Sequence, residues 1–242
     1  MSEVDAAGIQ TRLAAVREKL SQACARTGHQ VELMAVSKTF PAQAVLAAAQ
    51  AGQRVFGENY AQEGCAKIDE IKASHPELAL TWHFIGPLQA NKTRIVAEHF
   101  DWVDSVDRLK IAERLSSQRP AELPDLNLLI EVNIDGEASK SGVAPEDLEA
   151  LIEEVVKLPH VKLRGLMTIP APAATYDEQM KPLTAMRALY ERLAPRYGFD
   201  TLSMGMSADM IAAVEAGSTM VRIGSAIFGP RTYPNRKPQA EA

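Results

Sequence analysis

Lys38 is the residue whose position in the sequence most directly suggests chemistry. It follows the short, mostly apolar segment 31–37 and precedes a Thr-Phe-Pro run that ends this segment. A lysine beside an apolar surface loses hydration, which lowers its pKa and makes its amine a nucleophile. Lys38 could therefore form a Schiff base with a carbonyl compound. The alternative is a lysine that extends from the end of a strand into solvent.

Arg222 is the second candidate, because it lies inside an apolar segment. Side chains alternate along a strand, so Arg222 shares a face with Met220 and Gly224, and we expect it to point inward. A buried guanidinium keeps its charge and needs a carboxylate, a phosphate or a ring nitrogen as acceptor. The alternative is a structural ion pair with an inward acid such as Glu32 or Glu131.

Small and hydroxyl-bearing residues near the end of the sequence suggest an anion site. Glycine lets the backbone approach a ligand closely and serine donates hydrogen bonds, and the residues of these two kinds are Ser203, Gly205, Ser207, Gly224 and Ser225. Segment 207–210 also has the pattern of a helix start, where phosphate binds well. Ordinary turn chemistry is the alternative. An amine, an arginine and a phosphate site together are what pyridoxal 5′-phosphate requires of a protein.

Other candidates carry less weight. His83 has no second His or Cys at metal-ligand spacing, so we expect no zinc site, and it either contacts a ligand or is a hydrogen-bonded core residue. Met167, Met204 and Met206 favour core packing, although sulfur can line a flat ring. The sequence has no dinucleotide-binding glycine motif after its first predicted strand, no P-loop and no Gly-x-Ser-x-Gly elbow.

Composition excludes several classes of protein. The chain has 242 residues, of which 46% are hydrophobic, and a formal net charge of −5. This apolar content argues against disorder, and the acidic balance against nucleic-acid or anionic-membrane binding. Two cysteines are too few for a disulfide framework, and no apolar run reaches the ~20 residues of a membrane span. With an acidic start in place of a secretory signal, we expect a cytoplasmic protein.

Strands and helices are predicted to alternate along the chain. The predicted strands are 31–38, 54–59, 81–86, 102–106, 127–134, 161–169, 201–206 and 220–228, and the predicted helices are 4–26, 42–51, 60–73, 89–98, 108–118, 145–158, 176–194 and 208–216. Alternation implies parallel strands, and eight such units in ~250 residues predict a single (β/α)₈ TIM barrel with an extra N-terminal helix. An open doubly wound sheet is the alternative. Residues 1–229 would form one domain, and the proline-containing segment 230–242 a poorly ordered tail.

In such a barrel the chemistry lies at the carboxyl ends of the strands, which is where Lys38, Asn59, His83, Met206 and Arg222 are expected. Six segments there resemble the pyridoxal phosphate homeostasis proteins. They are AVSKT (35–39), FGENY (56–60), WHFIGPLQANK (82–92), GLMTI (165–169), LSMGMSAD (202–209) and VRIGSAIFG (221–229). The resemblance extends from the first helix to Gly229.

This resemblance implies a barrel like the N-terminal domain of alanine racemase, known as fold type III of the pyridoxal phosphate proteins. It implies that Lys38 holds the cofactor as an aldimine and that Arg222 faces the pyridine nitrogen. Phosphate contacts would come from Ser203, Gly205, Ser207, Gly224 and Ser225, while Asn59, His83 and Met206 would lie near the ring. Many members have a polar or basic residue where this sequence has Phe40, so a second-lysine relay there is in doubt. Lys140 is a candidate for transient cofactor contact.

The implied function is storage, buffering or delivery of pyridoxal 5′-phosphate, without robust catalysis. An arginine at the ring nitrogen leaves the pyridine unprotonated and weakens it as an electron sink. Racemase-type enzymes also take a second acid/base from a further β domain, for which we expect no room in this chain. Tyr60 is the tyrosine nearest a strand end, but nothing in the sequence assigns it that role. The alternatives are an amino-acid racemase-type enzyme and, more distantly, a cofactor-free barrel acting on phosphorylated sugars or indoles. We expect a monomer whose partners are the cofactor and pyridoxal phosphate-requiring apoenzymes.

Overall fold

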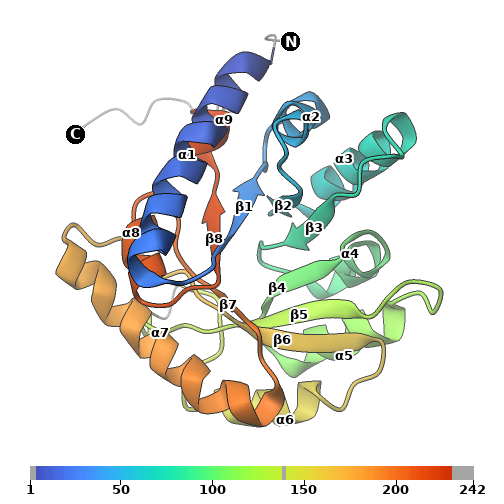
Figure 1. Cartoon of the computed structure of the whole chain (residues 1–242). Coiled ribbons are helices and arrows are strands. Elements are labelled where there is room, and N and C mark those ends of the chain that lie inside the picture. The colour runs from blue at the N-terminus through green and yellow to red at the C-terminus, as the bar shows by residue number, and fades with distance from the viewer. Residues whose placement is uncertain (1–3, 138–139, 231–242) are drawn as a thin grey trace, which may run out of the picture.

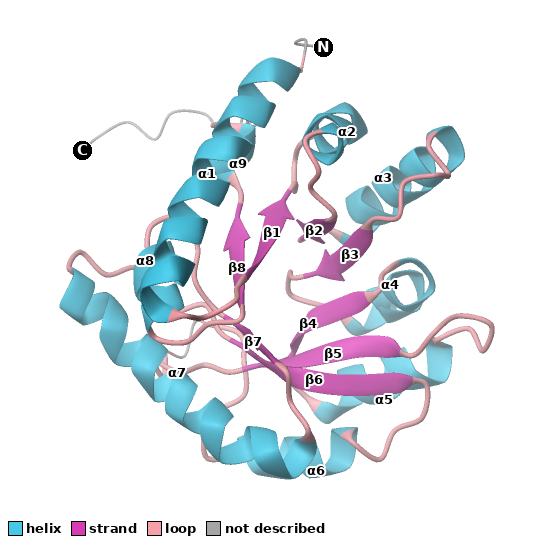
Figure 2. Ribbon diagram, in the orientation of Figure 1, coloured by secondary structure: helices cyan, strands magenta, loops and turns pink. Residues whose placement is uncertain are grey.

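Eight parallel strands pair in chain order and close into a barrel, because the last strand also pairs with the first (Figures 1 and 2). The computed structural model describes residues 4–137 and 140–230. The strands are β1 (Glu32–Val36), β2 (Val55–Glu58), β3 (Thr81–Phe84), β4 (Trp102–Val106), β5 (Leu126–Glu131), β6 (Val161–Met167), β7 (Thr201–Ser203) and β8 (Met220–Ile223). The predicted (β/α)₈ barrel is confirmed, and the open doubly wound alternative is wrong.

Helices surround the barrel on its outer side, as Figure 2 shows. They are α1 (Ala6–Thr27), α2 (Ala42–Gln50), α3 (Ala61–Ser74), the 3₁₀ turn η1 (Ala90–Lys92), α4 (Thr93–His99), α5 (Leu109–Gln118), α6 (Leu148–Val155), α7 (Tyr176–Tyr197), α8 (Met210–Glu215) and α9 (Ser225–Phe228). The extra N-terminal helix is α1, which packs against α2, α8 and α9. It therefore covers the seam between β8 and β1 (Figure 1).

The ends of α1 follow from its sequence. The Asp5 side chain accepts a hydrogen bond from the Gly8 amide at the first turn, and Gly28 ends the helix with a left-handed φ of 73°. Between these caps, the apolar residues at helical spacing are buried, namely Ile9, Leu13, Val16 and Leu20. The spacing read from the sequence thus gives the face that packs on the barrel.

Several predicted strands are shorter in the structure, and the difference falls at the carboxyl ends. β8 ends at Ile223, and residues 225–228 form α9 instead of continuing the strand. Gly224 makes the break with φ −111° and ψ −81°, outside the strand region. β1 likewise ends at Val36, two residues before Lys38. Lys38 and Ser225 therefore lie beyond the ends of their strands, whereas Arg222 lies within β8.

Two apolar clusters stabilise the fold. The larger one lies between the strands and the surrounding helices and includes Phe56, Trp82 and Phe100. The smaller one consists of Met34, Val36, Val55, Ile85 and Met220. Met34 and Val36 alternate with helix-facing Leu33 and Ala35, so this second cluster lies inside the barrel.

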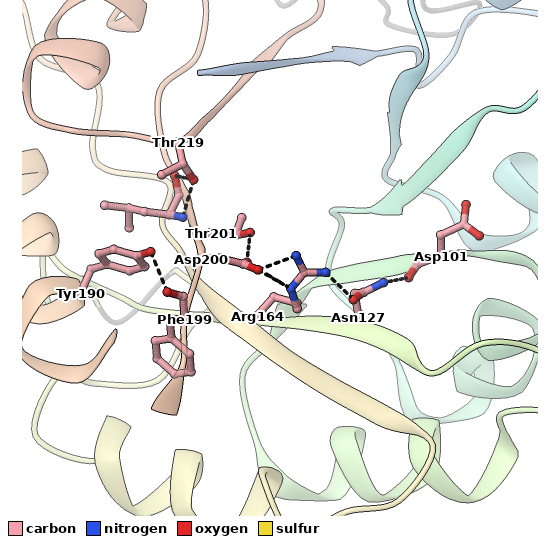
Figure 3. A network of polar contacts seen from close by, with 9 residues as sticks. Asp101, Asn127, Arg164, Tyr190, Phe199, Asp200, Thr201 and Thr219 are labelled. Atoms are coloured by element: carbon pink, nitrogen blue, oxygen red, sulfur yellow. Dashed lines mark hydrogen bonds and ion pairs between the residues drawn. The ribbon is translucent and has the colours of Figure 1, made fainter. Parts of the chain in front are cut away.

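Polar contacts centred on Arg164 of β6 lie near the amino-terminal ends of the neighbouring strands (Figure 3). Its guanidinium binds the Asp200 carboxylate before β7, and its Nη1 donates to Asn127 Oδ1 of β5 at 2.9 Å. Asn127 Nδ2 in turn donates to the Asp101 carbonyl before β4. The guanidinium also lies 4.7 Å from the centroid of the Trp102 ring. This network joins four consecutive strands at the end opposite Lys38.

Within the described ranges, no helix is both long enough and apolar enough to cross a membrane. The tail expected over 230–242 lies outside the described residues, except for Pro230. The division into a domain over 1–229 and a tail thus stays a prediction.

Candidate functional site

A cavity of about 270 Å³ opens at the carboxyl ends of the strands. Its volume is close to the lower bound of about 300 Å³ typical of ligand pockets. The turns after β1, β2, β3, β6, β7 and β8 all contribute to its lining, which consists of Val36, Lys38, Asn59, Ile85, Ile169, Met206, Ser207, Ala208, Arg222, Gly224 and Ser225. Among these, Lys38 and Arg222 are the charged residues. The structure thus brings most of the predicted site residues together around one cavity.

Lys38 lies in a tight turn whose conformation is uncommon. The Phe40 amide donates to the Ser37 carbonyl at 3.1 Å, and Thr39 has a φ of 69°. A β-branched residue rarely adopts this left-handed conformation, which costs roughly 1–3 kcal/mol. Such a turn persists only where neighbouring contacts hold it.

Those contacts come from a buried ion pair beneath the turn. Lys67 of α3 is 5% exposed, and its ammonium lies 2.6 Å from Glu58 Oε1 at the end of β2. The same ammonium donates to the Ser37 carbonyl at 2.9 Å, and the Ser37 hydroxyl donates to Glu58 Oε1 at 2.6 Å. On the other side of Lys38, the Thr39 amide donates to Glu63 Oε1 at 2.6 Å. Both chain neighbours of Lys38 are therefore bound to this network.

Burial raises the pKa of the Glu58 carboxyl, and the Lys67 ammonium and the Ser37 hydroxyl oppose that rise. The second carboxylate oxygen, Oε2, is buried without a hydrogen-bond partner among the described residues. Gly64 allows α3 to pack closely against Glu58 and Phe100, since a Cβ at this position would lie 2.6 Å from the Phe100 ring and 3.2 Å from the Glu58 Cβ.

Arg222 is 4% exposed and points into the barrel, as the alternation of β8 predicts. Its Nη1 donates to Ser203 Oγ at 2.7 Å and its Nη2 to the Thr168 carbonyl at 2.8 Å. Burial lowers the pKa of this guanidinium, and the carboxylates of Asp104, Asp209 and Glu131 oppose that effect. Because both acceptors are neutral and the guanidinium has five N–H donors, it retains donors toward the cavity.

The structural ion pair considered for Arg222 is not formed as expected. Glu32 is exposed at the first residue of β1, so it is wrong as an inward partner. Strand β1 begins at the amino-terminal end of the barrel, whereas Arg222 lies near the other end of β8. Glu131 acts on Arg222 through its charge, while the hydrogen bonds of Arg222 go to Ser203 and Thr168.

The turns after β7 and β8 supply the small residues of the cavity. Ser207, Gly224 and Ser225 line it, whereas Ser203 is fully buried behind it as the acceptor of Arg222. Gly205 has a φ of 100°, and a Cβ there would lie 2.4 Å from the Ala213 Cβ of α8. Only glycine fits this turn. The next residue, Met206, lines the cavity, and the Met206 amide donates to Asp209 Oδ1.

His83 and two other residues of interest lie outside the cavity. His83 is 1% exposed, its Nδ1 lies 3.0 Å from Asp104 Oδ1, and its ring stacks on Trp102 with centroids 4.8 Å apart. Its contact with a ligand stays a prediction. Phe40 packs on Phe228 of α9, with centroids 5.2 Å apart. Tyr60 is half exposed and lines a neighbouring cavity with Gln89 and Lys92.

A smaller cavity of about 190 Å³ adjoins the first and shares Asn59, Ile85 and Ile169 with it. Glu131 and Lys140 line it. Burial, with a contribution from the Asp107 carboxylate, raises the pKa of Glu131 to about 7, although Arg222 opposes this rise. The Lys140 ammonium lies 3.0 Å from Asp135 Oδ2, which holds it within its own loop.

Sequence reasoning missed the Thr168 carbonyl and the ion pair of Glu58 with Lys67. A carbonyl acceptor has no sequence signal. Glu63 and Lys67 do have i,i+4 spacing, which suggests an exposed helix pair, but nothing in the spacing shows that Lys67 is buried. Among the described residues, no group of three or more His, Cys, Asp or Glu side chains could hold a metal ion.

Comparison with known proteins places this geometry in a family. The model of the alanine racemase N-terminal domain matches residues 11–232. The pyridoxal phosphate homeostasis protein of Vibrio cholerae serotype O1 is 58% identical over 217 residues, which cover 89% of this chain and 92% of that protein.

Solved structures agree with this match. PipY of Synechococcus elongatus PCC7942, determined with PLP bound, has a TM-score of 0.80 and 38% identity, covering 91% of this chain and 100% of its own. Alanine racemase from Corynebacterium glutamicum has a TM-score of 0.68 and 18% identity, covering 98% of this chain and 64% of its own. At that identity the racemase shares the fold alone.

Proposed function

Since this chain belongs to the family of the pyridoxal phosphate homeostasis proteins, we propose that it binds pyridoxal 5′-phosphate in the cavity at the carboxyl end of its barrel. We further propose that it stores, buffers or delivers this cofactor inside the cell without robust catalysis. One observation carries the proposal, namely that Lys38 and Arg222 line the same small cavity together with the hydroxyl residues Ser207 and Ser225.

The residues present fit this cofactor. Arg222 is a buried cation whose hydrogen bonds to the described residues go to neutral acceptors, so a ligand with an acceptor nitrogen would bind one of its remaining donors. Lys38 supplies the amine that would condense with the cofactor aldehyde, with loss of water. Ser207, Gly224 and Ser225 supply hydroxyl groups and closely approaching backbone for a phosphate. Asn59 and Met206 also line the cavity.

Ser203 and Gly205 would act indirectly in this proposal. Ser203 fixes the guanidinium of Arg222, and Gly205 permits the turn that carries Met206 and Ser207. The contact of His83 with the ring, expected from the family resemblance, is the least supported of the proposed cofactor contacts. The Asp104 carboxylate and the Trp102 ring already engage this imidazole.

Carriage rather than catalysis is supported by the charges at the cavity. When bound, pyridoxal phosphate acts as an electron sink for amino-acid chemistry, most strongly when its ring nitrogen is protonated. An arginine does not give up a proton, so Arg222 would leave that nitrogen unprotonated. Racemisation also needs a second acid/base group opposite the lysine. Of the described side chains that line the cavity, only Lys38 and Arg222 are charged, and Glu131 lies in the adjoining cavity.

Colour and reduction test the binding proposal. We expect the purified protein, incubated with pyridoxal 5′-phosphate, to turn yellow, and borohydride to fix the cofactor mass on the peptide containing Lys38. Lys38→Ala should stay colourless and unlabelled. Lys157→Ala is the matched control, because Lys157 is exposed in the turn after α6 and does not line the cavity. A wild-type protein that stays colourless would overturn the proposal.

Exchange of the α-proton separates a carrier from a racemase-type enzyme. We expect free amino acids in deuterated water to keep their α-proton in the presence of the loaded protein, apart from a slow background that free cofactor also gives. Fast exchange that disappears in Lys38→Ala would favour the enzyme. Loss of the same exchange in Glu131→Gln would then identify Glu131 as its acid/base group.

A further inference from the structure

Lys67, Glu58 and Glu63 form a network that no step of the proposed function uses. The three residues come from the end of β2 and the first turns of α3, and Lys67 and Glu58 are almost fully buried. The Lys67 ammonium and the two carboxylates contact Ser37 and Thr39, the two residues that flank Lys38.

The contacts on the two flanking residues are made with backbone atoms as well as a side chain. Lys67 Nζ binds the Ser37 carbonyl, Glu58 binds the Ser37 hydroxyl, and Glu63 Oε1 accepts from the Thr39 amide. These bonds fix the peptide units on both sides of Lys38. They also hold Thr39 in its left-handed conformation, which a threonine would otherwise leave.

A buried ion pair is seldom retained for stability alone. Removing two charges from water costs about as much as their attraction returns, so an apolar pair of similar size often serves a fold equally well. Here the pair costs more, because Glu58 Oε2 has no hydrogen-bond partner within the described residues. The charged pair does, however, what an apolar pair could not do, since Lys67 donates to the Ser37 carbonyl while Glu58 accepts from the Ser37 hydroxyl. Lys67 also donates to Glu63, which accepts from the Thr39 amide.

On the premise that Lys38 is the cofactor lysine, we propose that Lys67 is a positioning residue, which with Glu58 and Glu63 fixes the turn of Lys38 and so aims its amine into the cavity. Lys67 is not among the residues that line the cavity, and its ammonium donates to the Ser37 carbonyl, Glu58 and Glu63. It acts through Ser37 and Glu63, and its loss would free the turn to sample other conformations. The amine would then meet the aldehyde in the correct geometry less often.

The test uses the full chain with three variants. Lys67→Met removes the ammonium but leaves the Glu58 charge buried without its partner, so this variant will be less stable or will fail to fold. The double variant Glu58→Gln with Lys67→Met removes both charges and should recover most of the lost melting temperature. Arg164→Gln is the control, because it breaks a polar network at the opposite end of the barrel.

Two readouts are measured on each variant. The first is the association rate of pyridoxal 5′-phosphate, followed by its visible absorbance. The second is independent of the cofactor, namely the pH profile of acetic anhydride labelling at Lys38 in the unloaded protein, read by mass spectrometry with Lys157 as internal reference. We expect the double variant to bind the cofactor about 10-fold more slowly than wild type, because the turn regains conformational freedom. We also expect the pH profile of its Lys38 labelling to shift. Arg164→Gln should match wild type in both readouts.

A double variant that regains stability and also matches wild type in association rate and labelling profile would overturn the positioning role. If instead wild-type protein fails to bind the cofactor, the proposed function fails, while the labelling profile still decides whether Lys67 positions Lys38. An equal loss in Arg164→Gln and in the double variant would show a general effect of stability and would also refute the proposal.

Discussion

The guanidinium of Arg222 and the hydroxyl of Ser203 are joined by a hydrogen bond of 2.7 Å across adjacent strands. This bond and the one to the Thr168 carbonyl fix the orientation of a buried cation at the base of the cavity. Ser203 thus matters to the site without lining it. A cation held by neutral partners keeps its full charge available to a ligand.

Changing the group that faces the ring nitrogen should change the spectrum of the loaded protein. We expect Arg222→Glu to favour the protonated pyridine and shift the visible absorption maximum, because a carboxylate stabilises that proton and a guanidinium does not. Arg222→Gln, which is neutral, should give no protonated form. Circular dichroism checks that both variants fold. Identical spectra for a folded Glu variant and wild type would contradict the placement of Arg222 at the ring.

Replacing Gly205 by alanine should damage the fold and the site together. The added Cβ would lie 2.4 Å from Ala213, which costs about 1–3 kcal/mol by overpacking, and the φ of 100° adds about 1–2 kcal/mol. Gly28→Ala is the matched control, because its φ is 73° but nothing lies within 4 Å of the added atom. Urea denaturation measures the free energy of unfolding of both variants. Equal losses would show that the contact with Ala213 is relieved without cost.

Glu131 should make the protein less stable as the pH rises through neutrality. Folding raises the pKa of this carboxyl from 4.5 to about 7, so the folded protein binds its proton more tightly than the unfolded chain does. The unfolding free energy therefore falls between these two pH values, by at most about 3 kcal/mol. We expect Glu131→Gln to remove this dependence and to exceed wild type in stability at pH 8. A wild-type stability that rises between pH 5 and 8, with the Gln variant parallel to it, would contradict the pKa.

The network of Arg164 should contribute stability that acid removes. Burial opposes ionisation of Asp200, yet hydrogen bonds from Arg164 and Thr201 hold its pKa below its usual value. The contribution is thus present above that usual value and is lost as the pH falls through the lowered one. We expect Arg164→Gln to lose about 1–2 kcal/mol at pH 7 and less at pH 3, measured by chemical denaturation. A loss that does not shrink in acid would point to packing on Trp102 instead.

Much of this fold could be predicted from the sequence, because the signals are local. The apolar spacing of α1 and its glycine end are properties of neighbouring residues, and so is the alternation that turns Arg222 inward. The closure of the barrel is different, since it depends on β8 pairing with β1. Eight alternating units predict that closure, but no residue type in β1 or β8 indicates that these two strands pair.

The details of the site could be predicted only in part. Lys38 and Arg222 could be predicted because charged residues are unusual beside or within apolar segments, and the serines because they gather with glycines near two strand ends. The burial of Lys67 and the carbonyl of Thr168 depend on how turns from distant segments approach each other, which the sequence does not encode position by position. The strand predicted over 220–228 failed for a related reason, because apolar residues of a short helix and of a strand look alike.

The pairing of β1 with β8 also has a consequence for the newly made chain. Lys38 leaves the ribosome long before Arg222 and Ser225 do, because they lie much further along the chain. The amine and the groups proposed to hold the ring and the phosphate thus meet only once the last strand has joined the first. Attachment of the cofactor would therefore require that β8 has already paired with β1, and the bound cofactor would link side chains from the two strands that close the barrel.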